Sequence, residues 1–82
     1  MTANEGAGAA THGVVLVPSV SYALRAEKVL VHAGLTVKLI PTPRQLSSDC
    51  GTAIRFSWAQ RDAVQRVLDD AGLVYDRLVP LS

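Results

Sequence analysis

Short apolar runs alternate along the chain with longer stretches in which apolar residues recur three or four positions apart. The first run, Val14 to Val17, is mostly β-branched and stops at Pro18, which is typical of a strand. In the stretch that follows, the spacing predicts an amphipathic helix, because residues three or four apart share one face. Gly34 is expected to end this helix, since glycine adopts the left-handed conformation at little cost. The predicted apolar face consists of Tyr22, Ala23, Ala26, Val29, Leu30 and Ala33, opposite Arg25, Lys28 and His32.

This strand and helix pattern occurs twice, so the chain contains an internal repeat. Segment 13–19 aligns with 51–57, and segment 29–35 aligns with 67–73. Each copy begins with a strand, continues through a serine and a helix to a glycine, and ends with a second strand. The apolar face of the second predicted helix consists of Ala59, Ala63, Val64, Val67, Leu68 and Ala71.

Both predicted helices carry signals at their ends. Ser57 and Gln60 have the spacing of a capping box, and Ser19 or Ser21 occupies the equivalent place in the first copy. Gly72 is expected to end the second helix, as Gly34 ends the first. The strands that complete the two copies are predicted over Leu35–Ile40 and Leu73–Val79.

The resulting order, βαββαβ, predicts an α+β fold of the ferredoxin-like kind, a four-stranded antiparallel sheet with two helices on one face. Right-handed crossovers place the first and third strands at the centre. Two valines on the face without helices favour a homodimer that covers it, while a scatter of exposed apolar residues remains the alternative. The period of two directs Leu16, Leu35, Val37, Ile54, Phe56, Leu73 and Tyr75 toward the helices, and Val15, Val17, Ala53 and Arg55 toward the open face.

Length and composition limit the class of protein. The 82 residues suffice for one small domain, predicted over residues 13–82 behind a mobile tail of residues 1–12 that is rich in glycine and alanine. A hydrophobic share of 49% and a charged share of 18% are too apolar for a disordered chain. The net charge of +1 gives no electrostatic footprint for nucleic acid. No apolar run is long enough to cross a membrane and no signal peptide is seen, so we expect a cytoplasmic protein.

The segment 41–50 joins the two copies and has no counterpart in the repeat. It is longer than a hairpin connection needs, and long loops on a rigid scaffold often carry function. Pro41 and Pro43 stiffen its beginning, and Gly51 permits a tight conformation at its end. In the predicted topology, this loop lies at the sheet edge where the first helix starts, near Ser19 and Ser21.

Cys50 is the only cysteine, which excludes an intramolecular disulfide and a cysteine-based zinc site within one chain, and no metal is expected. A free thiol has a pKa of about 8.5, so a mostly ionised thiol at neutral pH needs roughly 2.7 kcal/mol of stabilisation. A helix N-terminus supplies only about 0.3–1 kcal/mol. A guanidinium must therefore contribute, which nominates Arg44 first and Arg55 second. Ser47 and Ser48 could donate hydrogen bonds to the thiolate. A small, inert and buried cysteine is the alternative.

The residues Pro41-Thr42-Pro43-Arg44, Ser47, Cys50-Gly51 and Ala53-Ile54-Arg55-Phe56 resemble the selenium/sulfur carrier-like family of small bacterial domains. The segments 22–28 and 33–35 are also similar to that family, and the likeness covers about residues 14–79. The resemblance implies that Cys50 accepts sulfur or selenium as a persulfide or selenosulfide from a protein donor and passes it to a protein acceptor. It implies no cofactor. The Cys-Pro-x-Pro pattern of better-known sulfur carriers is not present, because here the prolines precede the cysteine.

Other classes of function remain open at this point. No catalytic dyad is visible, so a carrier or binding protein is expected rather than a stand-alone enzyme. One alternative is a regulatory module in which Arg44, Arg55 and the start of the first helix hold a small anion. Another is an interaction domain that dimerises through the open sheet face. His12, in the tail, and His32, on a solvent-facing helix side, are expected to be idle.

Overall fold

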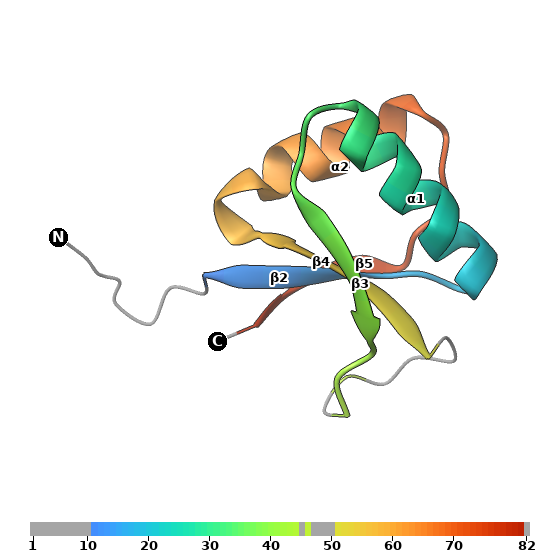
Figure 1. The fold of residues 1–82 in the computed structure, drawn as a ribbon, viewed down its shortest axis with the longest axis vertical. Coiled ribbons are helices and arrows are strands. Elements are labelled where there is room, and N and C mark those ends of the chain that lie inside the picture. Colours follow the sequence, from blue (N-terminus) through green and yellow to red (C-terminus); the bar gives the residue numbers. More distant parts are fainter. Residues whose placement is uncertain (1–10, 45, 47–50, 82) are drawn as a thin grey trace, which may run out of the picture.

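The computed structural model describes residues 11–44, 46 and 51–81 of the chain, and its elements follow the order that the repeat predicts (Figure 1). A short 3₁₀ turn, η1, precedes the second helix. The expected tail, residues 1–12, lies outside the described residues except for its last two positions. The elements are β2 (His12–Leu16), α1 (Val20–His32), β3 (Val37–Pro41), β4 (Thr52–Ser57), η1 (Trp58–Gln60), α2 (Arg61–Asp70) and β5 (Arg77–Leu81).

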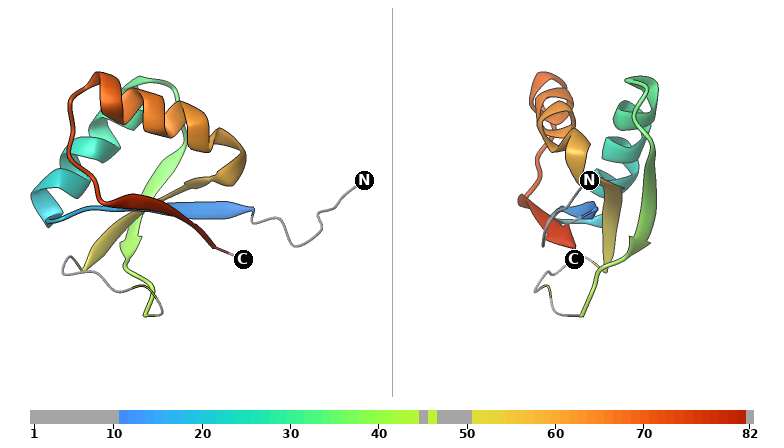
Figure 2. Two further views of the ribbon diagram at one scale, coloured as in Figure 1. Left: turned by 180° about the vertical axis from the view of Figure 1, so that it is seen from behind. Right: turned by 90° about the vertical axis from the view of Figure 1, so that its left-hand side faces the viewer.

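The strands form one four-stranded sheet in the order β3-β4-β2-β5, and every neighbouring pair is antiparallel. The first and third strands along the chain, β2 and β4, therefore lie at the centre. Figures 1 and 2 show that α1 and α2 both cover the same face of the sheet and leave the other face open. The predicted α+β fold of the ferredoxin-like class is confirmed.

The helix ends confirm the glycine signals but not the serine caps. Gly34 and Gly72 both have positive φ, +86° and +68°, and each lies two residues after the last residue of its helix, beyond the C-cap residues Ala33 and Ala71. Ser19 is extended and precedes α1, but its side chain makes no capping hydrogen bond. The capping box at Ser57 and Gln60 is wrong, because the Ser57 side chain makes no capping bond and α2 begins only at Arg61. Residues 58–60 form the 3₁₀ turn instead.

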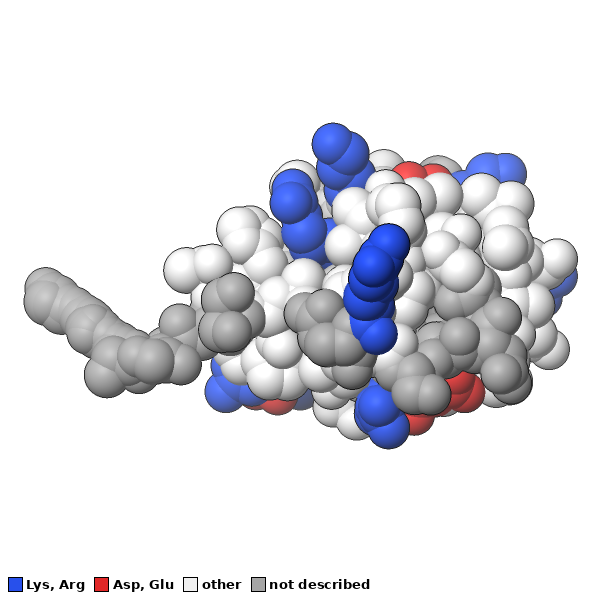
Figure 3. Space-filling model, turned by 90° about the horizontal axis from the view of Figure 1, so that it is seen from below, with Lys and Arg blue, Asp and Glu red and all other residues white. Residues whose placement is uncertain are grey.

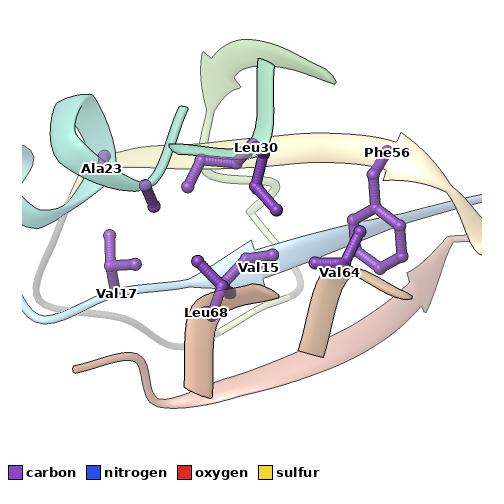
Figure 4. Close-up of a cluster of buried hydrophobic side chains, with 9 residues drawn as sticks. Val15, Val17, Ala23, Leu30, Phe56, Val64 and Leu68 are labelled. Carbon is purple, nitrogen blue, oxygen red and sulfur yellow. The ribbon is translucent and has the colours of Figure 1, made fainter. Parts of the chain in front are cut away.

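The main core lies between the helices and the sheet (Figure 4). Val15 and Val17 belong to this core, so their expected position on the open face is wrong. The register pairs Val15 with Ile54, and directly paired residues share a face of the sheet. The run from Val14 to Val17 is apolar at every position and does not alternate with polar residues, so the sequence could not determine which of the four face the helices. The core residues are Val15, Val17, Ala23, Ala26, Leu30, Ile54, Phe56, Val64 and Leu68.

A second, smaller cluster lies on the open face and consists of Val14, Leu16 and Ala53. The expectation that Leu16 faces the helices is therefore also wrong. All three residues are buried within one chain, although no helix covers them. The two valines on which the homodimer was based do not lie on this face, and a homodimer remains a prediction. The half-buried residues that pack against the cluster are Ile40, Leu46, Val79 and Leu81.

The last strand begins later than expected. Residues 73–76 form no strand, and β5 covers only Arg77–Leu81. Leu73 and Tyr75 nevertheless pack against the core between helices and sheet, as their alternation predicted. The backbone N–H of Asp76 donates to the carbonyl of Leu16 at 2.7 Å, which fixes the point where the chain joins the sheet.

Candidate functional site

The loop between β3 and β4 is closed at its base by backbone interactions. Pro41 pairs with Thr52 in the register of the two strands. The backbone N–H of Thr42 donates to the carbonyl of Gly51 at 3.0 Å. The segment singled out by the sequence therefore starts and ends at fixed positions on the rim of the sheet.

The first half of the loop turns toward the open face. The backbone N–H of Leu46 donates to the carbonyl of Pro43 at 3.0 Å, which closes a turn that contains Arg44. Leu46 is half-buried and packs against Val14, Leu16 and Ala53. Arg44 is exposed. Burial of Leu46 thus anchors the loop beneath the sheet and presents the Arg44 guanidinium to solvent.

Three predicted site residues, Cys50, Ser47 and Ser48, lie outside the described residues. Gly51, which directly follows Cys50 in the sequence, is exposed. It lines a mainly apolar hollow of about 360 Å³ together with Val20, the first residue of α1. The end of the loop and the start of α1 therefore border the same hollow. Its other lining residues are Leu39, Ile40, Pro41 and Thr52.

The start of α1 has a second hollow, of about 350 Å³, lined by Ser19, Ser21, Tyr22 and Arg25. The helical spacing predicted Arg25 on the solvent side of the helix, without a functional role. Arg25 follows Ser21 by four positions, so the two share one side of the helix. That spacing is the signal that could have associated Arg25 with the two serines.

Arg55 is not on the same side of the sheet as the serines. It is exposed on β4, paired with Val14 on one side and with Lys38 on the other. Val14 belongs to the cluster on the open face, so Arg55 faces that side too. Ser19 and Ser21 lie at the start of α1, which packs on the opposite face. Arg55 therefore belongs to the open side and the serines to the helical side, while Arg44 is exposed in the loop whose Leu46 packs on the open side.

A further hollow, of about 590 Å³, lies between η1, α2 and β5. Trp58 contributes to it, and the Arg61 guanidinium lies 5.5 Å from the centre of the indole ring. The Arg61 Nη1 group also donates to the Trp58 carbonyl at 3.2 Å. Arginine and aspartate side chains both line this hollow, so it favours neither sign of charge.

Tyr75 borders this hollow and gives the fold a specific pH dependence. Its hydroxyl donates to Asp69 Oδ1 at 3.0 Å. Burial raises the pKa of Tyr75 above its ordinary value, the bond and negative charge of Asp69 raise it further, and a hydrogen bond with Gln65 acts in the opposite direction. A pKa raised by folding stabilises the folded state below the unfolded pKa of about 10, and this contribution disappears as the pH rises above that value.

We therefore expect the free energy of unfolding to fall as the pH is raised through about 10 and beyond, and Tyr75→Phe to weaken this fall. Denaturant titrations between neutral pH and the alkaline limit of folding would measure it. Tyr22→Phe is the matched control, because Tyr22 is the other tyrosine of the chain. An equal fall in wild type and Tyr75→Phe would contradict the assignment.

Among the described residues, no helix is long and apolar enough to cross a membrane. Within the same part of the chain, no group of three or more His, Cys, Asp or Glu side chains is placed to hold a metal ion.

The fold and the loop define a small α+β domain that presents an arginine-bearing loop at the rim of its sheet. The model of a family described as "Putative Se/S carrier protein-like" matches residues 12–80. The chain belongs to this family, as the motifs around the loop predicted. Searches of the curated proteins and of the solved structures returned no significant match.

Proposed function

We propose that the protein carries sulfur or selenium on Cys50 between a donor protein and an acceptor protein. Membership of the Se/S carrier family is the observation that carries this proposal. Cys50 is the only thiol of the chain, so a cysteine-bound atom can have no other place. The closed base of the loop supports the role, because the exposed Gly51 lies at a fixed point of the rim directly after Cys50.

The transfer is an exchange between sulfur atoms. The Cys50 thiolate attacks the terminal sulfur of a donor persulfide, a new sulfur–sulfur bond forms on Cys50, and the donor thiolate leaves. The atom moves with its oxidation state unchanged, so no external oxidant or reductant is needed. A terminal selenium atom on the donor would transfer in the same way. The acceptor thiolate then attacks the terminal atom on Cys50 and releases the Cys50 thiolate.

The described arginines suit this chemistry. Arg44 is exposed in the turn that leads toward Cys50, and Arg55 is exposed on the open face of the sheet. A guanidinium near a thiol or persulfide favours its anionic form, which is the nucleophile. We assign Arg44 the larger contribution, because it belongs to the loop itself. A cytoplasmic location would keep the thiol reduced between transfers.

The direct test incubates the full chain with glutathione persulfide and then measures the mass of the intact protein and of its proteolytic peptides. Wild type is expected to gain the mass of one sulfur atom on the peptide that contains Cys50, and a reductant should remove it. Cys50→Ser should gain nothing and keep the circular dichroism spectrum of the wild type. Unchanged mass in wild type, or equal gain in Cys50→Ser, would contradict the carrier role.

The pH dependence of Cys50 alkylation tests the role of Arg44. Arg44→Ala is expected to raise the pKa of the Cys50 thiol, because it removes the only cation in the sequence of the loop. Arg25→Ala removes an arginine from the helical side and should leave the profile unchanged. An identical profile for wild type and Arg44→Ala would remove Arg44 from the site. An ordinary thiol profile in wild type would favour the regulatory module that binds a small anion.

A further inference from the structure

The open face of the sheet carries positive charge in a pattern set by the register of the strands. Val14 and Leu16 lie on this face, and the residues paired with them across the sheet share it. Arg55 is paired with Val14, Lys38 with Arg55, and Arg77 with Leu16. Two of the rows that cross the face are Lys38, Arg55, Val14 and Val79, and Ile40, Ala53, Leu16 and Arg77.

We call the surface formed by Lys38, Arg55, Arg77 and the adjoining Arg44 the cationic sheet face. These four side chains are exposed, and they make up half of the eight lysines and arginines of the chain. Among the described residues, no carboxylate occupies either row of the face. Figure 3 views the molecule from this side and shows a blue cation near the middle of the face and further blue cations toward its outline, where the red carboxylates also lie.

Lys38 and Arg55 form a pair of like charges on this surface. They are directly opposite each other on β3 and β4, and both are exposed. Like charges in directly opposed positions destabilise a sheet. No ion pair relieves the repulsion within the part of the chain that the structure describes. A pair of this kind is relieved when an anionic group binds across both cations.

Four of the five described carboxylates belong to the helices, Glu27 to α1 and Asp62, Asp69 and Asp70 to α2, and both helices cover the opposite face of the sheet. The fifth, Asp76, directly precedes Arg77 and lines the hollow between η1, α2 and β5 with it. The helices also carry Arg25, Lys28, Arg61 and Arg66, so their charges balance, whereas the described part of the open face has an excess of cations. Such an excess orients an approaching acidic partner and raises the rate of productive encounters.

The chemistry of the face favours a protein partner over nucleic acid. The cluster of Val14, Leu16 and Ala53 is itself buried, and the half-buried aliphatic residues that pack on it supply the accessible apolar surface between the cations. An apolar centre with a polar rim is the usual anatomy of a protein–protein interface. The aromatic residues Phe56, Trp58 and Tyr75 pack with the core on the helical side, so the described part of this face offers no platform for stacking bases.

We propose that the cationic sheet face is a docking surface for a partner protein that presents a carboxylate-rich patch with apolar side chains. Leu46 connects this face to the loop, because it packs on the same cluster. A partner docked here would contact the rim from which the loop extends. That this partner is the sulfur or selenium donor or acceptor rests on the proposed function, whereas docking itself does not require Cys50.

The test uses the full chain labelled with ¹⁵N and a synthetic peptide of alternating glutamate and leucine as the probe. We expect shifts of the amide signals of β3, β4, β2 and β5, and weaker binding as salt is added. Lys38→Glu/Arg55→Glu should weaken binding by about ten-fold or more. Arg25→Glu/Lys28→Glu is the matched control, because it reverses two exposed cations on α1 and should leave binding within about two-fold of wild type.

Several outcomes would overturn the proposal. Absent binding at millimolar peptide, shifts confined to the helices, or an equal loss in the control variant would each contradict it. Tighter binding of a single-stranded oligonucleotide of equal charge through the same amides would replace the protein partner by nucleic acid. Unchanged binding by Cys50→Ser is expected, so a failed sulfur transfer and a failed docking are separate results.

A single substitution distinguishes a loss of peptide binding at this surface from a loss of binding caused by misfolding. Lys38→Glu converts the repulsive pair with Arg55 into an attractive one, so the unfolding midpoint is expected to rise. The same variant should bind the acidic peptide more weakly than wild type. Weaker binding by a more stable protein would show that Lys38 serves recognition. Unchanged binding despite the higher midpoint would remove Lys38 from the surface.

Discussion

Replacing Phe56 by alanine is expected to lower the free energy of unfolding by about 3–5 kcal/mol. Phe56 is 1% exposed and is the largest of the fully buried side chains among the described residues. It lies on the central strand β4 within the core between helices and sheet, and its ring centre is 5.8 Å from that of Trp58. Truncation removes apolar contact and leaves a cavity that a small core cannot fill.

The size of this loss matters because the protein is small. Per-residue averages give about 4–12 kcal/mol of total stability for a domain of this length. Phe56→Ala should therefore leave a large fraction unfolded near room temperature or shift the urea midpoint strongly downward. Leu24→Ala, at a helix position that is 51% exposed, is the control and should change the midpoint little. A loss below about 1 kcal/mol in Phe56→Ala would contradict the described core.

Gly13→Ala is expected to cost about 1–3 kcal/mol, which is large for the addition of one methyl group. A Cβ atom at Gly13 would lie 2.3 Å from Cε3 and 2.7 Å from Cζ3 of Trp58, and 3.0 Å from the carbonyl oxygen of Val79. The indole ring must move away from β2, which would disturb its contacts with Phe56 and with the Arg61 guanidinium. Gly13 has no positive φ, so the reason for glycine here is space.

Trp58 is the only tryptophan, so its fluorescence reports the displacement directly. We expect a changed emission maximum in folded Gly13→Ala together with a lower urea midpoint. Gly51→Ala is the matched control, because a Cβ there meets nothing within 4 Å and the residue has no positive φ. In Trp58→Ala, the added methyl group at Gly13 should cost much less. An equal cost of Gly13→Ala with and without Trp58 would contradict the contact.

Much of the fold could be read from local features of the sequence. The helical spacing of apolar residues predicted both helices, and the glycines predicted where they end, since Gly34 and Gly72 have positive φ. The internal repeat predicted the order of the elements and the central position of two strands. These predictions succeed because they depend on the conformational preferences of neighbouring residues, which remain the same wherever the segment lies.

The candidate site was predictable only in part. The length of the loop, its prolines and the lone Cys50 identified the segment and the family. The sequence could not show that Leu46 buries its side chain against the open face. Ser19 and Ser21 were grouped with Arg55, but the fold places them on opposite sides of the sheet. Proximity of this kind depends on which face each element occupies.

The sequence by itself determined the kinds of element, their order, the helix ends and the family. Only the tertiary structure decided which residues of β2 face the helices, namely Val15 rather than Leu16. It also decided that Lys38 on β3 lies directly opposite Arg55 on β4. Gly13 and Gly51 occupy equivalent places in the repeat, yet only Gly13 is pressed against an indole ring. The physical reason is that pairing between strands distant in the chain selects the face of every side chain, and no short-range pattern contains that choice.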